Sequence, residues 1–140
     1  MTTILFGSNG FLGKNLIPKL VKNREDFIVI KKEECDLQSL EETVEIFKQH
    51  KPHTVVNLAG RVGGFLANRN RPADLGLINL QIGTNICVAA LESGAKRIIN
   101  FLGSCSYPSH IIEGIREEDL ATGLPDKTSA PYAMGKTAIH

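Results

Sequence analysis

The chain has 140 residues and a formal net charge of +1, which fits one domain with a sizeable core. Its 16 basic residues are scattered, apart from Lys31-Lys32 and Lys96-Arg97, and this distribution argues against a nucleic-acid partner. No apolar run reaches the ~18 residues of a membrane helix, the N-terminus has no signal-peptide pattern, and three widely spaced cysteines suggest neither a disulfide framework nor a metal site. We therefore expect a cytoplasmic protein that binds no membrane, metal or nucleic acid.

Short apolar segments alternate with helix-length segments along the chain. The predicted strands cover Thr3–Phe6, Phe27–Ile30, Thr54–Gly60 and Arg97–Ser104. The predicted helices cover Gly10–Asn23 with a kink or early stop at Pro18, Asp36–His50 with Ser39 as N-cap, Leu77–Ser93, and a segment that starts near Pro131. This alternation predicts an α/β fold, a Rossmann-like doubly wound parallel sheet with ligands at the carboxyl ends of its strands.

A glycine-rich loop follows the first predicted strand, with Gly7, Gly10 and Gly13 spaced G-x-x-G-x-x-G. Glycine permits a tight turn and close approach of the backbone to a pyrophosphate, and the following helix N-terminus favours anions. The spacing therefore predicts a dinucleotide site, and the alternative is a tight strand-to-helix turn without a ligand. A P-loop is excluded because Asn15 replaces the Ser or Thr that binds magnesium. The predicted cofactor contacts here are Gly7, Ser8, Asn9, Gly10, Phe11, Leu12 and Gly13.

The second predicted strand runs directly into Lys31 and Lys32, where NAD sites usually carry an acidic residue for the ribose 2′-hydroxyl. A lysine here could pair with a 2′-phosphate, which favours NADP (as NADPH) over NAD. The alternative is that both lysines are solvated surface residues. Further cofactor contacts are predicted at Asp36 and Leu37, beside the adenine, and at Leu58, Ala59 and Gly60.

Tyr132 and Lys136 lie four residues apart, so a helix would place them on one face. A free tyrosine has a pKa near ~10, and a nearby ammonium, with the positive nicotinamide, would lower it toward neutral pH. Ser104, at the end of the fourth predicted strand, offers a hydroxyl to a substrate carbonyl. The three residues predict a proton relay for carbonyl reduction by hydride, and the alternative is a helix with one amphipathic tyrosine.

These motifs together resemble the extended short-chain dehydrogenase/reductase family, and more narrowly its GDP-L-fucose synthase branch. The resemblance implies an NADPH-dependent enzyme that converts GDP-4-keto-6-deoxy-mannose to GDP-fucose by epimerisation and reduction at C4. The alternatives are an epimerase/reductase or dehydratase for another nucleotide sugar, and a non-catalytic NAD(P)-binding module. The segments that carry the resemblance are "NLAG" (Asn57–Gly60), "RVGGFLANRNRPADL" (Arg61–Leu75), "NLQIGTN" (Asn79–Asn85), "FLGSCSYP" (Phe101–Pro108) and "EEDLATGLPDKTSAPYAMGK" (Glu117–Lys136).

The resemblance implies catalytic roles for Ser104, Cys105, Tyr132 and Lys136, the last two also as cofactor contacts. The family's loop normally reads Gly-Ser-Ser-Cys-x-Tyr-Pro, and "GSCSYP" is one residue shorter. Counting back from its tyrosine aligns Cys105 with the family's cysteine and puts a glycine at the serine position. Counting forward from that glycine aligns Ser104 with the serine and puts another serine at the cysteine position. We favour a loop in which Ser104 and Cys105 both function.

The resemblance also implies a second half, with the last strands of the sheet, a sugar-binding domain and a histidine that pairs with the cysteine. We therefore expect residues 1–140 to be an incomplete NAD(P)-binding domain without a substrate-binding domain. Such a chain should bind the cofactor weakly and show little or no turnover by itself. The implied ligand is a GDP-sugar, and a homodimer through Leu77–Ser93 and the helix beginning near Tyr132 is possible within the family.

Overall fold

The computed structural model describes residues 2–140, which form two compact units. One unit consists of the residues up to Gly60 together with Gln81–Phe101, and the other of Arg61–Leu80 together with Leu102–His140. The elements, in chain order, are β1 Thr3–Phe6, α1 Phe11–Lys22, β2 Ile28–Ile30, α2 Leu40–His50, β3 Thr54–Asn57, α3 Phe65–Asn70, α4 Pro72–Ser93, β4 Arg97–Asn100, the 3₁₀ turns η1 Ser104–Ser106 and η2 Glu117–Asp119, and α5 Ala130–Thr137.

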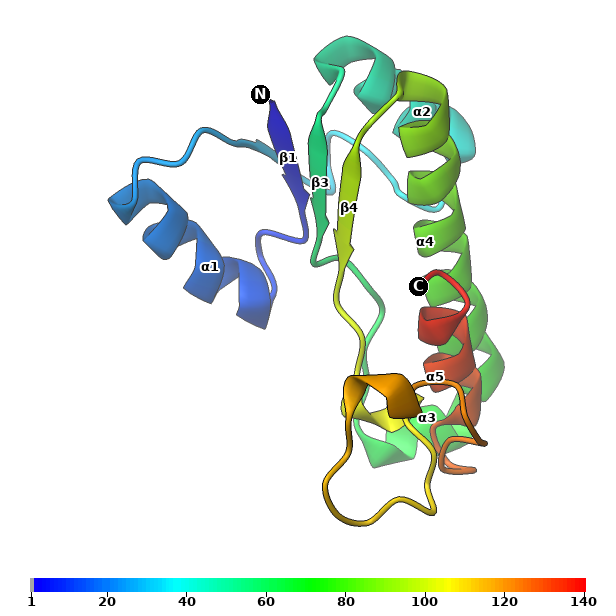
Figure 1. Ribbon diagram of the computed structural model, residues 1–140. Coiled ribbons are helices and arrows are strands. Elements are labelled where there is room, and N and C mark those ends of the chain that lie inside the picture. Colours follow the sequence, from blue (N-terminus) through cyan, green and yellow to red (C-terminus); the bar gives the residue numbers. More distant parts are fainter. Residues whose placement is uncertain (1) are drawn as a thin grey trace. The chain divides into compact units, whose positions relative to one another are not determined.

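The first unit contains a four-stranded parallel sheet with the order β2-β1-β3-β4. Leu5 at the middle of β1 is aligned with Val29 of β2 and Val56 of β3. This order, with every strand parallel, confirms the predicted Rossmann-like α/β class. In this unit α1 lies on one face of the sheet, and α2 and the later turns of α4 lie on the other (Figure 1).

The core of this unit lies between the sheet and the α2/α4 layer. Alternate side chains of a strand point to opposite faces, so Ile4 and Phe6 face this layer together. The ring of Phe6 stacks on that of Phe47 in α2, with centroids 6.1 Å apart. Ile86 and Ala89 of α4 are fully buried in the same cluster. This packing anchors the strands whose carboxyl ends were predicted to bind the ligand.

Several element boundaries differ from the sequence prediction. Helix α1 continues through Pro18 to Lys22, so an early stop there is wrong. Helix α4 begins at Pro72, five residues before the predicted start, because proline is well suited to the first turn of a helix. Strands β3 and β4 end at Asn57 and Asn100, earlier than predicted. The prediction that Ser39 caps α2 is confirmed, since its Oγ accepts a hydrogen bond from Glu42 N at 3.2 Å.

The long helix α4 is the one element among residues 2–140 that is long and apolar enough to cross a membrane. Its buried residues instead pack as those of a core helix do. Ile86 and Ala89 lie in the hydrophobic core, and the buried amide of Asn85 donates a hydrogen bond to Leu37 O at 2.9 Å. A buried amide with a fixed partner specifies one position of the later turns of α4 within the first unit.

Candidate active site

The β1–α1 loop of the first unit has the close backbone packing that its glycines were predicted to allow. Gly7 has φ +82°, and a Cβ there would lie 2.5 Å from the backbone carbon of Leu58. A Cβ on Gly13, inside α1, would lie 2.5 Å from Gly7 O. The turn itself is closed by a hydrogen bond from Gly10 N to Gly7 O at 3.2 Å. No side chain fits at Gly7 or Gly13, so the chain can approach a ligand here as bare backbone.

The N-terminus of α1 is prepared for an anion. Its N-cap is Gly10, which has no side chain to accept from the first turn, and that turn carries no acidic residue. Within the described residues, the backbone N–H groups of Phe11, Leu12 and Gly13 have no hydrogen-bond partner. Free N–H groups and the positive end of the helix dipole are the features that hold a pyrophosphate. The loop therefore fits the diphosphate of a dinucleotide cofactor.

The carboxyl end of β3 lies directly beside this loop. Leu58 N donates to Phe6 O at 3.1 Å, which continues the β1–β3 pairing by one residue. The side chain of Asn57, only 1% exposed, accepts from Ala59 N at 3.1 Å and donates to Asn100 Oδ1 at 3.0 Å. These bonds turn the chain after Asn57 and fix Leu58 and Ala59, two of the predicted cofactor contacts, against Gly7.

The carboxyl end of β2 carries a carboxylate that sequence reasoning did not place there. Lys31 and Lys32 are exposed, as predicted, but Lys31 N donates to Glu34 Oε2 at 2.8 Å. Asp36 is exposed and its Oδ1 accepts from Gln38 N at 3.1 Å, whereas the Leu37 side chain is buried in the core. The strand end thus presents two lysines and one acidic side chain, and of the predicted adenine contacts only Asp36 lies at the surface.

In the second unit, η1 and α5 bring Cys105 and Tyr132 together. A Cβ placed on Gly103 would lie 3.1 Å from Cys105 Sγ and 3.7 Å from Tyr132 Cε1. The thiol and the phenol ring therefore flank the space that a side chain at position 103 would fill. This arrangement agrees with the alignment that is counted back from Tyr107. In that alignment Cys105 takes the place of the family's cysteine, and Gly103, which has no hydroxyl, takes the place of its serine.

The Cys105 thiol is partly buried, and its surroundings act on its pKa in two directions. Burial raises the pKa, while the backbone N–H of Cys105 and the neighbouring Ser129 hydroxyl lower it. The rise from burial is the larger effect. The thiol is thus kept protonated more firmly than a free cysteine, with two donors in place that would stabilise its anion.

The pKa of Tyr132 is raised, by burial first and then by charge on Cys105. This direction is opposite to the sequence expectation that the ammonium of Lys136 would lower it. The physical reason is that burial disfavours the charged phenolate. In addition, Cys105 forms an anion when it ionises, and this negative charge also disfavours the phenolate. In this structure Tyr132 is therefore a firmly protonated phenol, which suits a proton donor.

Lys136 lies in α5 four residues after Tyr132, as predicted. Its side chain is 5% exposed, and burial lowers its pKa. Among residues 2–140 it has no hydrogen bond or ion pair. The ammonium nitrogen is not among the buried polar atoms without a partner, so it keeps some contact with solvent and is available to a ligand hydroxyl.

The two serines of the short loop differ in their surroundings. Ser104 is exposed, and its backbone oxygen accepts from Tyr107 N at 3.2 Å. Ser106 is 3% exposed, and its Oγ has no hydrogen-bond partner among the described residues. The structure brings neither hydroxyl into a hydrogen bond with Tyr132, so the role predicted for Ser104 stays a prediction.

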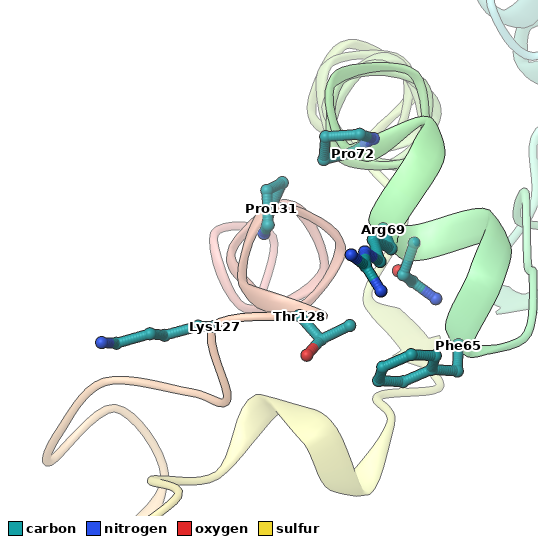
Figure 2. A pocket seen from close by; sticks show the side chains of 7 residues that line it. Phe65, Arg69, Pro72, Lys127, Thr128 and Pro131 are labelled. Atoms are coloured by element: carbon teal, nitrogen blue, oxygen red, sulfur yellow. The ribbon is translucent and has the colours of Figure 1, made fainter.

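A hollow of about 360 Å³ lies on the second unit, between α3, the start of α4 and the segment that leads into α5. Figure 2 shows the ring of Phe65 and the side chain of Thr128 on opposite sides, with Arg69 between them and Lys127 extending away. Its lining contains an aromatic ring, a guanidinium and a hydroxyl but no carboxylate, so it suits an anionic polar group. The remaining lining residues are Asn68, Pro72 and Pro131.

Two residues of the second unit were named from the sequence only as parts of the segments that carry the resemblance, without a role of their own. Asn79, 2% exposed, accepts from Arg61 N at 3.1 Å and donates to Arg61 O at 2.7 Å and Leu75 O at 2.6 Å. Ser129 precedes α5, and its hydroxyl lowers the pKa of Cys105. For Asn79 the signal was an asparagine inside a long apolar helix, and for Ser129 the only signal was a serine before Pro131.

The first unit combines a parallel Rossmann-like sheet, a glycine turn and an open helix N-terminus, which together define the class of dinucleotide-binding α/β proteins. The sequence pattern of the NAD dependent epimerase/dehydratase family matches residues 3–140, and the chain belongs to that family.

Several characterised proteins are similar to this chain. The GDP-L-colitose synthase of Yersinia pseudotuberculosis is 32% identical over 136 residues, which cover 97% of this chain and 44% of that protein. The GDP-L-fucose synthase of Sinorhizobium fredii is 35% identical over 132 residues, 94% of this chain and 42% of that protein. A GDP-L-fucose synthetase of Naegleria fowleri, solved with NADP bound, is 26% identical with a TM-score of 0.88, and the match covers 99% of this chain and 45% of that one. The chain thus spans less than half the length of these relatives.

Proposed function

We propose that this chain supplies the cofactor-binding and proton-transfer residues of an NADPH-dependent epimerase/reductase that acts on a GDP-linked 4-keto sugar. The substrate that the sequence resemblance favours is GDP-4-keto-6-deoxy-mannose, with GDP-fucose as product. The observation that carries the proposal is the meeting of Cys105 and Tyr132, with Lys136 one helical turn further on. A module that only binds a dinucleotide has no use for a thiol and a phenol ring that flank the same space beside Gly103.

The pyrophosphate of the cofactor is assigned to the free N–H groups at the start of α1, and the 2′-phosphate to Lys31 or Lys32. Relatives solved with NADP support this choice of cofactor. Glu34, which lies at the same strand end, would repel a 2′-phosphate unless the lysines outweigh it. NADPH, when bound, supplies the hydride for the sugar's C4 carbonyl.

The residues of the second unit carry the proton transfers. Reduction places negative charge on the sugar's O4, and the protonated phenol of Tyr132 donates to that oxygen. Epimerisation requires a proton to be removed from a carbon next to the keto group and another to be returned from the opposite face. The thiolate of Cys105 is the base that takes the first proton, and the histidine that the resemblance implies would return the second. Lys136 is a largely buried lysine whose ammonium has no partner among the described residues and is free to hold a ligand hydroxyl. A neighbouring acid and base with different proton affinities are typical of catalytic pairs.

Relatives named for colitose synthesis support a second choice of sugar within the same reaction class. From the resemblance we also propose that the enzyme has a sugar-binding domain and forms a homodimer. A cytoplasmic location is in keeping with an enzyme that uses NADPH and a nucleotide sugar.

The test combines binding and turnover, for the native chain and for Tyr132→Phe. Calorimetric titration should show that NADPH binds more tightly than NADH and that Tyr132→Phe leaves NADPH affinity nearly unchanged. Oxidation of NADPH at 340 nm, started with GDP-4-keto-6-deoxy-mannose, should be lost in Tyr132→Phe, by about 100-fold or more where wild-type turnover is measurable. Equal and measurable oxidation by both proteins would contradict the role of Tyr132, and equal affinity for NADPH and NADH would contradict the cofactor assignment.

A further inference from the structure

A tight turn at residues 36–39 lies between β2 and α2 and contains two of the predicted adenine contacts. It is closed by a hydrogen bond from Ser39 N to Asp36 O at 2.8 Å. The side chain of Asp36 closes it a second time, because its Oδ1 accepts from Gln38 N at 3.1 Å. The exposed carboxylate of Asp36 therefore has a fixed place relative to the backbone of the turn.

Two amide side chains of α4 bind the carbonyl groups of this turn. Gln81 Nε2 donates to Gln38 O at 2.8 Å, and Asn85 Nδ2 donates to Leu37 O at 2.9 Å. The two amides lie four residues apart, so they are on the same face of the helix. Both donors and both acceptors belong to the first unit. The turn is thus held by a helix of the core as well as by its own hydrogen bonds.

The backbone N–H groups of the turn are paired with one exception. Asp36 N donates to Glu42 Oε2 at 2.8 Å. The N–H groups of Gln38 and Ser39 have the partners given above. Leu37 N has no hydrogen-bond partner within residues 2–140, although the residue is only 8% exposed. Since backbone N–H groups in such positions are normally paired, this donor is open to a ligand that reaches the turn.

The open donor and the exposed carboxylate belong to consecutive residues. Together they offer one N–H and one acceptor to a ligand, and the edge of adenine carries the complementary pair, an acceptor nitrogen and an amino group. Their relative place depends on the path of the backbone at Leu37 and Gln38. The carbonyl groups of these two residues are the ones that Asn85 and Gln81 bind, so the two amides act directly on that path.

Fold stability alone gives a weak reason for the bond from Gln81. Its side chain is exposed, and one exposed hydrogen bond adds little to the stability of a fold because water can replace either partner. The bond from Asn85 is buried and also fixes the later turns of α4, so it serves the fold as well as the turn. Gln81 is therefore the residue at which an effect on the turn can be separated from an effect on the core.

We infer that Gln81 and Asn85 are positioning residues for the cofactor: they hold the turn at residues 36–39 in the shape that presents the Asp36 carboxylate and the Leu37 N–H to the adenine. This role rests on the proposed function in taking NADPH as the cofactor. It goes further because neither amide was predicted to take part in cofactor binding, and both act through the backbone of the turn.

The effect on the turn is tested by hydrogen exchange followed by mass spectrometry. Gln81→Met keeps the length of the side chain, adds no charge and removes the donor to Gln38 O. Exchange in the peptide that covers residues 36–39 should become about fivefold faster, with native rates in the strands. Gln49→Met, the same change at an exposed position of α2, should leave that peptide at the native rate.

The effect on the cofactor is tested by calorimetric titration with NADPH and NADH. Adenine is common to both, so Gln81→Met should weaken the binding of both by the same factor, about fivefold, and Gln49→Met should weaken neither. Asn85→Asp is the second arm, because it keeps the volume of the side chain and loses the donor to Leu37 O. It should also weaken both cofactors equally.

Native exchange in the turn, or native affinity for both cofactors, in Gln81→Met overturns the inference. A loss confined to NADPH overturns it too, because the effect would then belong to the 2′-phosphate. A native chain that binds neither cofactor overturns this role together with the cofactor assignment. Equal native affinities for NADPH and NADH, or a failed turnover test, contradict the proposed function alone, since the adenine contact is measured without a sugar and with either cofactor.

Discussion

Gly135 of α5 lies against the backbone of Gly76 in α4, so close that a Cβ on Gly135 would collide with the Gly76 carbonyl oxygen. A Cβ on Gly76 would in turn lie 2.8 Å from Pro131 O. The two helices of the second unit therefore cross backbone to backbone. This crossing sets the position of the α5 turn that carries Tyr132 and Lys136.

The first prediction concerns this crossing. Gly135→Ala and Gly76→Ala should each lower the free energy of unfolding by about 1–3 kcal/mol, because the added methyl group meets backbone that cannot move aside cheaply. Urea denaturation followed by circular dichroism measures the change. Gly64→Ala, in open space at the start of α3, is the matched control and should cost much less. Equal losses at all three glycines would show that helix crossing is not the cause.

The second prediction concerns Lys136, a largely buried residue whose ammonium has no hydrogen-bond or ion-pair partner among the described residues. Lys136→Met should raise the free energy of unfolding at neutral pH by about 1 kcal/mol. The same change should abolish the proposed NADPH-dependent reduction of the GDP-linked keto sugar. Lys48→Met, at an exposed position of α2, should change stability by less than about 0.5 kcal/mol. A clear loss of stability in Lys136→Met would mean that the ammonium stabilises the native fold.

The same lysine predicts the pH dependence of stability. Its pKa is lowered in the folded state, so the unfolded chain binds more protons in the interval between the two pKa values. Stability should therefore rise with pH from the folded pKa up to the normal lysine value of 10.5. Urea titrations at increasing alkaline pH should show this rise in the native protein and a smaller one in Lys136→Met. The same slope in both proteins would assign it to other groups.

The third prediction concerns cofactor choice at the end of β2. Lys31→Gln and Lys32→Gln together should weaken NADPH binding by about tenfold or more and leave NADH binding within about twofold, since only NADPH carries the 2′-phosphate. Glu34→Gln should strengthen NADPH binding, because it removes a negative charge near that phosphate while keeping an acceptor for Lys31 N. Fluorescence titration with both cofactors measures these changes. Equal losses for the two cofactors would place the lysines away from the 2′-position.

The fourth prediction concerns the hydrogen bonds that Asn79 makes with the Arg61 backbone. Asn79→Leu removes three hydrogen bonds from a buried position and should lower the free energy of unfolding by about 2–4 kcal/mol. Asn79→Asp keeps the acceptor for Arg61 N but loses the donors to Arg61 O and Leu75 O. It should also destabilise the protein, because a buried carboxylate would then face two carbonyl oxygens. A stability near the native value in both variants would contradict a structural role.

The sheet could be predicted because its signals are local. Each strand is a short apolar run that ends before a glycine or a polar residue, and Leu5, Val55 and Val56 are buried as such runs predict. Helix α3 could not be predicted in this way. Its Phe65 and Leu66 are 64% and 68% exposed, so it has no buried apolar stripe to mark it in the sequence.

The site was partly predictable for a similar reason. The glycine loop and the Tyr132–Lys136 spacing follow from the geometry of one turn and one helix. The place of Glu34 at the end of β2 depends on a turn that folds its carboxylate back to Lys31 N. The effect of Ser129 on the pKa of Cys105 links segments 24 positions apart, and Ser129 makes no capping bond although the sequence favours one.

The division of the chain into two units has a consequence for modularity. Each unit is assembled from two separated segments, and the chain enters the second unit at Arg61, returns to the first at Gln81 and leaves it again after Phe101. During synthesis the first unit cannot close before its fourth strand has left the ribosome, by which time the first segment of the second unit is already present. Neither unit is a continuous stretch of sequence. A recombination event that exchanged one of them would therefore need three crossovers or two insertions. The two units are therefore inherited together.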